Sequence, residues 1–209
     1  MNKFSIIQLE VARKDPKQFA TNLKATSGTK QSFFRRSKLT RWQDAVGEYH
    51  KTNDLAKAIN YLEKSFSQRA DTTKNRNEVS RFINSLDAYV TQYTKNGFVL
   101  LERRKRIKII LNSKVFIGGQ VPIIYMNAKG GFSIYFVVQS SIVWESELRF
   151  PVLQKYFAED IFGVGSDKVE VGVFSTHNDK FSQRTFSEDE IKGADKELKK
   201  LGKVFYDIL

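Results

Sequence analysis

The chain has 209 residues, of which 41% are hydrophobic, so it can bury a sizeable core, and no stretch approaches the roughly 20 apolar residues of a membrane span. It has no cysteine, which excludes disulfides, thiolate metal sites and a cysteine nucleophile. The formal net charge is +12, with 24 Lys and Arg against 10 Asp and Glu in residues 1–114 and 11 against 13 in residues 115–209.

This uneven charge predicts an anionic partner for the first part of the chain. A solvated basic surface that only aids solubility would have the same composition. The N-terminal stretch MNKFSIIQLEVARK has no long apolar region of the kind found in signal peptides. We therefore expect a cytoplasmic protein that does not act at a membrane.

The first half, residues 1–97, predicts a basic helical segment. Asp15 and Pro16 are typical of a helix start, and Asp54 can cap a helix whose apolar residues recur at helical spacing. Asn96 and Gly97 are typical of a helix end. The sequence predicts helices over residues 5–12, 16–26, 42–51, 55–69 and 78–95, with a polar loop over 70–76.

One part of this segment mixes cations with aromatic residues. The sequence FFRRSKLTRW places four cations, Arg35, Arg36, Lys38 and Arg41, among Phe33, Phe34 and Trp42. Guanidinium groups bind phosphate well and aromatic rings stack on bases, so the pattern indicates nucleic-acid binding. It fits equally well a helix whose aromatic residues are core anchors and whose cations face solvent.

The second half, residues 98–209, predicts a mixed α/β core that forms one compact unit with the helices. β-branched residues favour strands over residues 98–111, 115–125 and 168–176, and residues 132–139 are apolar enough for a central strand. A helix is expected over 147–162, and because it contains Pro151 it either starts at this proline, with residues 149–150 extended, or is kinked there. A loop is expected over 176–183. Ser187 and Glu190 form a capping box at the start of a C-terminal helix.

The order of elements from Phe98 to Thr176 resembles the PD-(D/E)XK nuclease superfamily, in its RecB-like branch, over about 80 residues. The stretches that carry the resemblance are Leu101-Glu102, Val115–Ile123, Gly130–Val138, Leu153–Tyr156 and Val169–Phe174. The resemblance implies a restriction-endonuclease-like core. The resulting fold class is α/β (α+β), with a helical first half packed on a mixed, mostly antiparallel sheet, a crossover helix and a C-terminal helix.

The residues that would perform nuclease chemistry are absent from the matched positions. In that family carboxylates hold a divalent metal and a lysine lies near the attacking water. Here the matched positions are Pro122, Phe136 and Val138, and only Glu102 keeps a carboxylate. Glu145 and Glu147 follow the third strand and are the candidates for a relocated acidic pair.

The remaining candidates are a cationic run and two histidines. The run consists of Arg103, Arg104, Lys105, Arg106 and Lys108. Its members alternate faces along a strand, so about half could meet one ligand, or they could instead guard a sheet edge against aggregation. His50 and His177 are too scattered to form a metal site.

Three functions follow from these observations. The favoured one is a non-catalytic nucleic-acid-binding protein on a degenerate nuclease scaffold, without a cofactor and with DNA as the favoured ligand. It would be a subunit of a bacterial or phage DNA-processing, DNA-repair or antiviral defence system. The alternatives are a protein–protein adaptor subunit without nucleic-acid contact, and a nuclease with relocated acids that would require Mg²⁺. The predicted nucleic-acid-binding residues are Arg35, Arg36, Lys38, Arg41, Arg103, Arg104, Lys105, Arg106 and Lys108.

Overall fold

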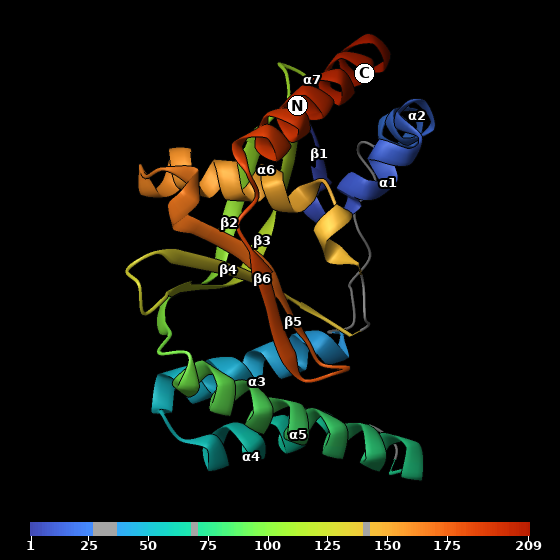
Figure 1. Cartoon of the computed structure of the whole chain (residues 1–209). Coiled ribbons are helices and arrows are strands. Elements are labelled where there is room, and N and C mark those ends of the chain that lie inside the picture. Colours follow the sequence, from blue (N-terminus) through green and yellow to red (C-terminus); the bar gives the residue numbers. More distant parts are fainter. Residues whose placement is uncertain (27–36, 68–70, 140–142) are drawn as a thin grey trace.

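The computed structural model describes residues 1–26, 37–67, 71–139 and 143–209 (Figure 1). The helices are α1 (Leu9–Lys14), α2 (Pro16–Thr26), α3 (Lys38–Thr52), α4 (Leu55–Phe66), α5 (Thr73–Lys95), α6 (Arg149–Tyr156) and α7 (Glu188–Ile208). The strands are β1 (Asn2–Ser5), β2 (Val99–Ile110), β3 (Val115–Met126), β4 (Phe132–Val138), β5 (Val169–Ser175) and β6 (Lys180–Arg184). Short helical turns are η1 (Ile6–Gln8), η2 (Trp144–Ser146), η3 (Phe157–Phe162) and η4 (Ser166–Lys168).

The strands form one mixed sheet in which β3, β4, β5 and β6 are successive neighbours. β2 pairs along nearly the whole of β3, while β1 pairs with the start of β3 and β4 with its end. The pairs β2–β3, β3–β4 and β5–β6 are antiparallel, whereas β1–β3 and β4–β5 are parallel. Two consecutive parallel strands need a crossover connection, and α6 lies in the segment that joins β4 to β5. The expected fold class, a mostly antiparallel sheet with a crossover helix and a C-terminal helix, is therefore confirmed.

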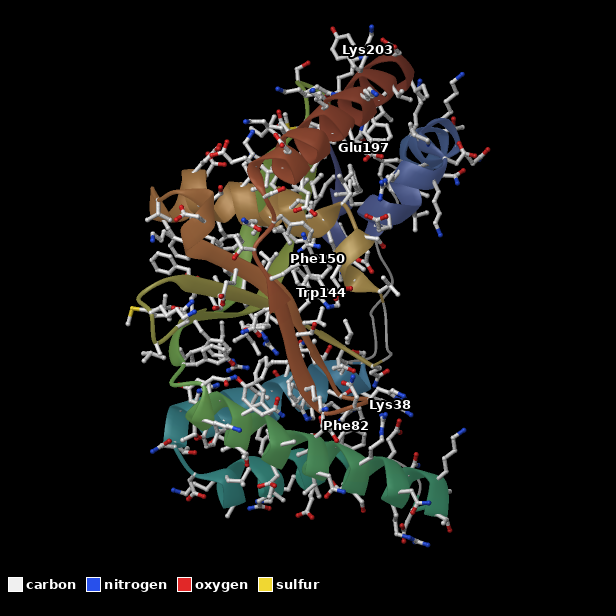
Figure 2. The ribbon with its side chains drawn as sticks, viewed as in Figure 1. Lys38, Phe82, Trp144, Phe150, Glu197 and Lys203 are labelled. Carbon is white, nitrogen blue, oxygen red and sulfur yellow. The ribbon has the colours of Figure 1, made fainter. Side chains whose placement is uncertain are left out.

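Each face of the sheet carries its own apolar cluster, because successive strand residues point to opposite faces. Phe136 on β4 and Val173 on β5 pack with α6 and α7 in the α7-side cluster. Their chain neighbours Tyr135 and Phe174 pack with α3, α4 and α5 in the α3-side cluster. Figure 2 labels one residue of each cluster: Phe150, on α6, and Phe82, on α5.

The helices of the first half are divided between these two clusters. Residues 2–5 pair with β3 as strand β1, and α2 packs against α7. Only α3, α4 and α5 form the layer on the other face. The division of the chain into a basic helical segment 1–97 and a core 98–209 stays a prediction, while the packing shows both parts sharing one sheet.

Three predicted boundaries are wrong. The sequence predicts a loop over 176–183, but residues 180–183 belong to β6, which pairs with β5. Residues 73–76 were also expected in a loop but begin α5, because the Thr72 hydroxyl caps its first turn. The helix near Pro151 begins at Arg149, which places the proline in the first turn, where its missing N–H costs no helical hydrogen bond.

Candidate nucleic-acid interface

A cleft of about 860 Å³ lies where the first turn of α3 meets β1, β2, β3 and β4. We call it the basic cleft, because three cations line it: Lys3 from β1, and Arg104 and Arg106 from β2. Its neutral polar lining comes from Ser37, Thr40, Gln43 and Gln120. No carboxylate is among the described lining residues, so the local field favours an anion.

The start of α3 adds to the positive potential of the basic cleft. Ser37 is the N-cap, and its hydroxyl accepts the backbone N–H of Thr40 at 3.1 Å. The first turn contains no acidic residue that would offset the positive end of the helix dipole. Since Ser37 and Thr40 also line the cleft, this end of α3 faces the space in which an anion would lie.

An unusual backbone conformation places two consecutive arginines on α3. Arg104 has a φ of +57°, which interrupts the alternation of side chains along β2. Arg103 donates to the carbonyl of Gln43 at 2.5 Å, and Arg104 forms an ion pair with Asp44. Left-handed backbone at a non-glycine residue is costly and is concentrated at functional sites, which makes Arg104 a marker for the basic cleft.

The other predicted binding residues are engaged elsewhere or lie outside the described ranges. Arg35 and Arg36 belong to the undescribed residues 27–36. On α3, Lys38 forms an ion pair with Glu78, and the guanidinium of Arg41 lies 5.6 Å from the centre of the Phe66 ring.

On β2, Lys105 forms an ion pair with Glu102 at 2.9 Å, and the Lys108 ammonium lies 5.3 Å from the centre of the Phe116 ring. Of the predicted set, the cleft therefore brings together Arg104 and Arg106.

Lys3 is the cleft cation that sequence reasoning missed. It reaches the cleft because β1 pairs in parallel with the start of β3, which sets Lys3 opposite Phe116. A four-residue strand carries too little periodicity to be recognised, and its partner lies more than a hundred residues away. In the described part of the chain, Lys3 and Arg106 have no ion-pair partner, so both charges are available to a ligand.

Two positions that resemble metal-binding positions of the nuclease superfamily line this same cleft. Pro122 and Phe136 are both lining residues, and Val138 is buried in the α7-side cluster. Glu102 is exposed and pairs with Lys105. Across the described ranges there is no group of three or more His, Cys, Asp or Glu side chains that could hold a metal. Mg²⁺ requires several oxygen ligands, and the side chains of Pro122, Phe136 and Val138 contain no oxygen.

A buried arginine, Arg149, packs against Phe136, which is one of the residues that line the cleft. The guanidinium of Arg149 lies 5.0 Å from the centre of the Phe136 ring and 4.8 Å from that of Phe150. It pairs with Glu147 at 2.5 Å, and burial raises the pKa of this carboxyl although Arg149 acts in the opposite direction. The charge of Arg149 is thus balanced within the protein.

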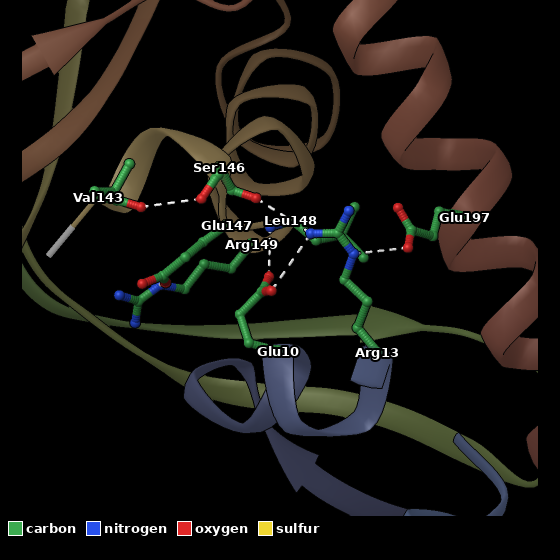
Figure 3. Close-up of polar contacts among 8 residues, drawn as sticks. All are labelled: Glu10, Arg13, Val143, Ser146, Glu147, Leu148, Arg149 and Glu197. Carbon is green, nitrogen blue, oxygen red and sulfur yellow. Dashed lines mark hydrogen bonds and ion pairs between the residues drawn. The ribbon is translucent and has the colours of Figure 1, made fainter. Parts of the chain in front are cut away.

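Further polar contacts around Arg149 connect the start of α6 with α1 and α7 (Figure 3). Glu10 on α1 accepts the backbone N–H of Leu148 at 2.5 Å. Arg13 donates to Glu197 on α7 at 2.7 Å and to the Ser146 carbonyl at 3.1 Å. Three elements distant in sequence, α1, the η2–α6 segment and α7, are therefore joined by polar contacts next to Arg149.

Two further residues from the sequence analysis, Gln154 and His50, make hydrogen-bond contacts within the protein. Gln154, part of the Leu153–Tyr156 stretch, is buried and donates to the carbonyls of Ser166 and Phe186 at 3.0 Å each. His50 contacts the Tyr89 hydroxyl at 2.7 Å in the α3-side cluster. Burial, with a smaller effect of Arg103, lowers the pKa of His50 to about 4, so the ring is neutral at pH 7.

No protein-family model matches the chain, and no curated protein matches it. Among solved structures, the protein SSO0001 is 15% identical, covers 93% of this chain and 86% of its own, and superposes with a TM-score of 0.31. The structure named "Putative exonuclease" from Eubacterium rectale is 8% identical, covers 91% and 74%, and has a TM-score of 0.41. Scores this low do not establish a shared fold. None of the described helices is long and apolar enough to cross a membrane.

Proposed function

We propose that this chain is a non-catalytic nucleic-acid-binding protein that holds a phosphate backbone in the basic cleft. The observation that carries the proposal is the cleft itself. Its cations Lys3 and Arg106 have no ion-pair partner among the described residues, and the first turn of α3 faces the same space. Among the lining residues that the structure describes, none is a carboxylate. Cations and helix N-termini are the groups that bind phosphate in proteins.

The absence of catalysis is proposed from the residue types at the cleft. Pro122 and Phe136 occupy the positions that resemble metal-binding positions, and neither can bind a divalent cation. The order β2, β3, β4, α6, β5 supports a degenerate PD-(D/E)XK scaffold of the RecB-like branch. On this proposal the protein needs no cofactor and acts within a bacterial or phage DNA-processing or defence system.

The ligand is proposed to be DNA, bound with little sequence preference. Contacts from lysine and arginine to phosphates position a protein without reading bases, and their strength depends on salt. The test is the affinity of the full chain for labelled DNA, measured by fluorescence anisotropy over a salt series. Lys3→Gln with Arg106→Gln should weaken binding and flatten the plot of log K against log salt by about 1.8, or roughly 0.9 per lost contact.

A matched control removes the same charge elsewhere. Lys51, at the C-terminal end of α3, and Lys64, on α4, are exposed and do not line the cleft, so Lys51→Gln with Lys64→Gln should leave the slope nearly unchanged. Equal losses of affinity for both pairs of substitutions would mean that net charge, and not the cleft, drives binding.

Two results with the wild-type chain would contradict the proposal. DNA cleavage in Mg²⁺ that EDTA abolishes would favour a nuclease with relocated acidic residues. Retention of no DNA at low salt would favour the adaptor.

A further inference from the structure

The outward face of α7 is a continuous ridge of lysines. Ile191, Leu201 and Phe205 are buried against the sheet, whereas the opposite side of the helix is exposed. On that exposed side the lysines follow one another at spacings that keep them on one face of a helix. These residues, here called the lysine ridge, are Lys192, Lys196, Lys199, Lys200 and Lys203. They extend over about 16 Å at 1.5 Å per residue.

The ridge is electrostatically unfavourable by itself. Glu188 and Asp195 lie at its flank and pair with Lys192 and Lys199 at 3.1 and 2.8 Å. Lys196, Lys200 and Lys203 have no ion-pair partner in the described part of the chain, and they repel one another as like charges three and four residues apart. They precede the last turn, so the helix dipole does little to relieve the repulsion.

A solvated helix of ordinary design would mix charges of both signs on this face. Between the first turn and the last turn of α7, the exposed residues are the five lysines and Gly193; the acidic residues near them include Asp195, half-buried at the flank, and Asp189 and Asp207, at the two ends of the same face. An arrangement that costs stability in the free protein is expected where a ligand removes the cost. The ligand must be anionic and must present several charges along a line.

We propose that the lysine ridge is a second phosphate-backbone surface, whose ligand is duplex nucleic acid. A duplex carries one negative charge per roughly 1.7 Å of its axis, which matches a straight row of cations on a convex helix. A membrane surface is disfavoured, because a helix lying on lipid inserts apolar side chains, and those of α7 are buried in the protein core. The proposal does not rest on the basic cleft.

The position of the ridge gives it a separate role. α7 covers the face of the sheet opposite α3, and Lys203 extends away from the body of the molecule (Figure 2). The basic cleft is formed with the start of α3. This bridging role, unlike binding by the ridge itself, rests on the proposed function of the cleft: with one nucleic-acid segment on the ridge and another in the cleft, different sides of one chain would bridge two segments.

The test uses three variants of the full chain and a labelled duplex of mixed sequence. The ridge variant is Lys196→Gln/Lys200→Gln/Lys203→Gln, in which glutamine keeps helix propensity. The cleft variant is Lys3→Gln/Arg106→Gln. The control variant, Lys51→Gln/Lys64→Gln/Lys95→Gln, removes three exposed lysines from other helices. The ridge variant should flatten the salt dependence of duplex binding by about 2.7, and the control should not.

A capture assay separates the two surfaces. Wild-type chain on an immobilised duplex should retain a second, fluorescent duplex at a ratio of two duplexes per chain. The ridge and cleft variants should each still bind one duplex and lose the second. The ridge variant should also unfold at the same or a slightly higher temperature, because the repulsion is relieved.

The outcomes distinguish this inference from the proposed function. If the ridge variant binds duplex with the wild-type affinity and salt slope, or loses no more than the control, the ridge proposal is overturned and the cleft proposal stands. If the cleft variant binds as wild type while the ridge variant does not, the ridge is supported and the cleft proposal falls. A wild-type chain that binds no duplex at any salt concentration overturns both.

Discussion

His50 links protonation to the stability of the α3-side cluster. Its pKa is lowered to about 4 by burial and by Arg103, whereas a histidine in the unfolded chain titrates near 6.5. As pH falls below about 6.5, the unfolded state binds a proton that the folded state does not. The free energy of unfolding should therefore decrease between pH 6.5 and 4, by at most about 3 kcal/mol, and this group should add no further loss below pH 4.

Denaturant unfolding at a series of pH values checks this expectation. His50→Gln keeps a group that can contact the Tyr89 hydroxyl but removes the titration, so its stability should be flatter than that of wild type over this window. His177→Gln, at an exposed position, is the control and should follow wild type. An unchanged decline in His50→Gln would assign the pH dependence to carboxylates instead.

At the same scale, the sequence indicates where cations cluster but not which of them meet. The run from Arg103 to Lys108 predicts a basic strand, and strand alternation predicts that half of it shares a face. The left-handed backbone at Arg104 breaks this alternation. Neither arginine itself nor the adjacent residues in the sequence predict a left-handed conformation at Arg104. The conformation occurs together with long-range contacts, from Arg104 to Asp44 and from Arg103 to Gln43.

Among the elements, the contact between α3 and β2 depends on a glycine. Gly47 lies in the interior of α3, and a Cβ there would overlap the guanidinium of Arg103. Gly47→Ala should therefore displace Arg103 and break its bond to Gln43. We expect a net loss of about 0.5–2 kcal/mol, because a hydrogen bond from a charged group contributes about 1.5–3 kcal/mol and alanine returns about 1 kcal/mol of helix propensity.

The sign of this effect should reverse when the arginine is absent. In an Arg103→Ala background, Gly47→Ala meets no side chain and should stabilise the protein by up to about 1 kcal/mol. Urea unfolding of the two single variants, the double variant and wild type gives the coupling energy directly. A stabilising Gly47→Ala in the wild-type background would show that Arg103 is readily accommodated elsewhere and does not fix α3 on β2.

Elements with local signals are those that the sequence predicts well. The capping box of α7 forms as expected, with the Glu190 carboxylate accepting the Ser187 N–H at 2.8 Å, and Asp54 caps α4. Strands β1 and β6 were missed, because four and five residues carry little pattern and their pairing depends on β3 and β5. The basic cleft depends on β1, so its full composition was beyond sequence reasoning for the same reason.

At the scale of the whole molecule, the shared sheet predicts a single unfolding transition. Strands β3, β4 and β5 supply side chains to both clusters, so neither cluster can come apart while the sheet stays intact. Each cluster contains one buried tryptophan whose fluorescence can report its unfolding: Trp42 in the α3-side cluster and Trp144 in the α7-side cluster. Thermal unfolding followed by fluorescence in Trp42→Phe and in Trp144→Phe should each show one transition, coincident with that from far-UV circular dichroism.

A destabilising change in one cluster makes the test decisive. Leu62 is completely buried on α4, far in sequence from Trp144, and Leu62→Ala should cost about 2–5 kcal/mol. If the sheet couples the two faces, this change lowers the midpoint reported by Trp144 as much as that reported by Trp42. A Trp144 midpoint that stays in place would mean that residues 98–209 unfold independently of the helices of the first half. The boundary at residue 97 would then separate two domains, despite the sheet that both parts contribute to.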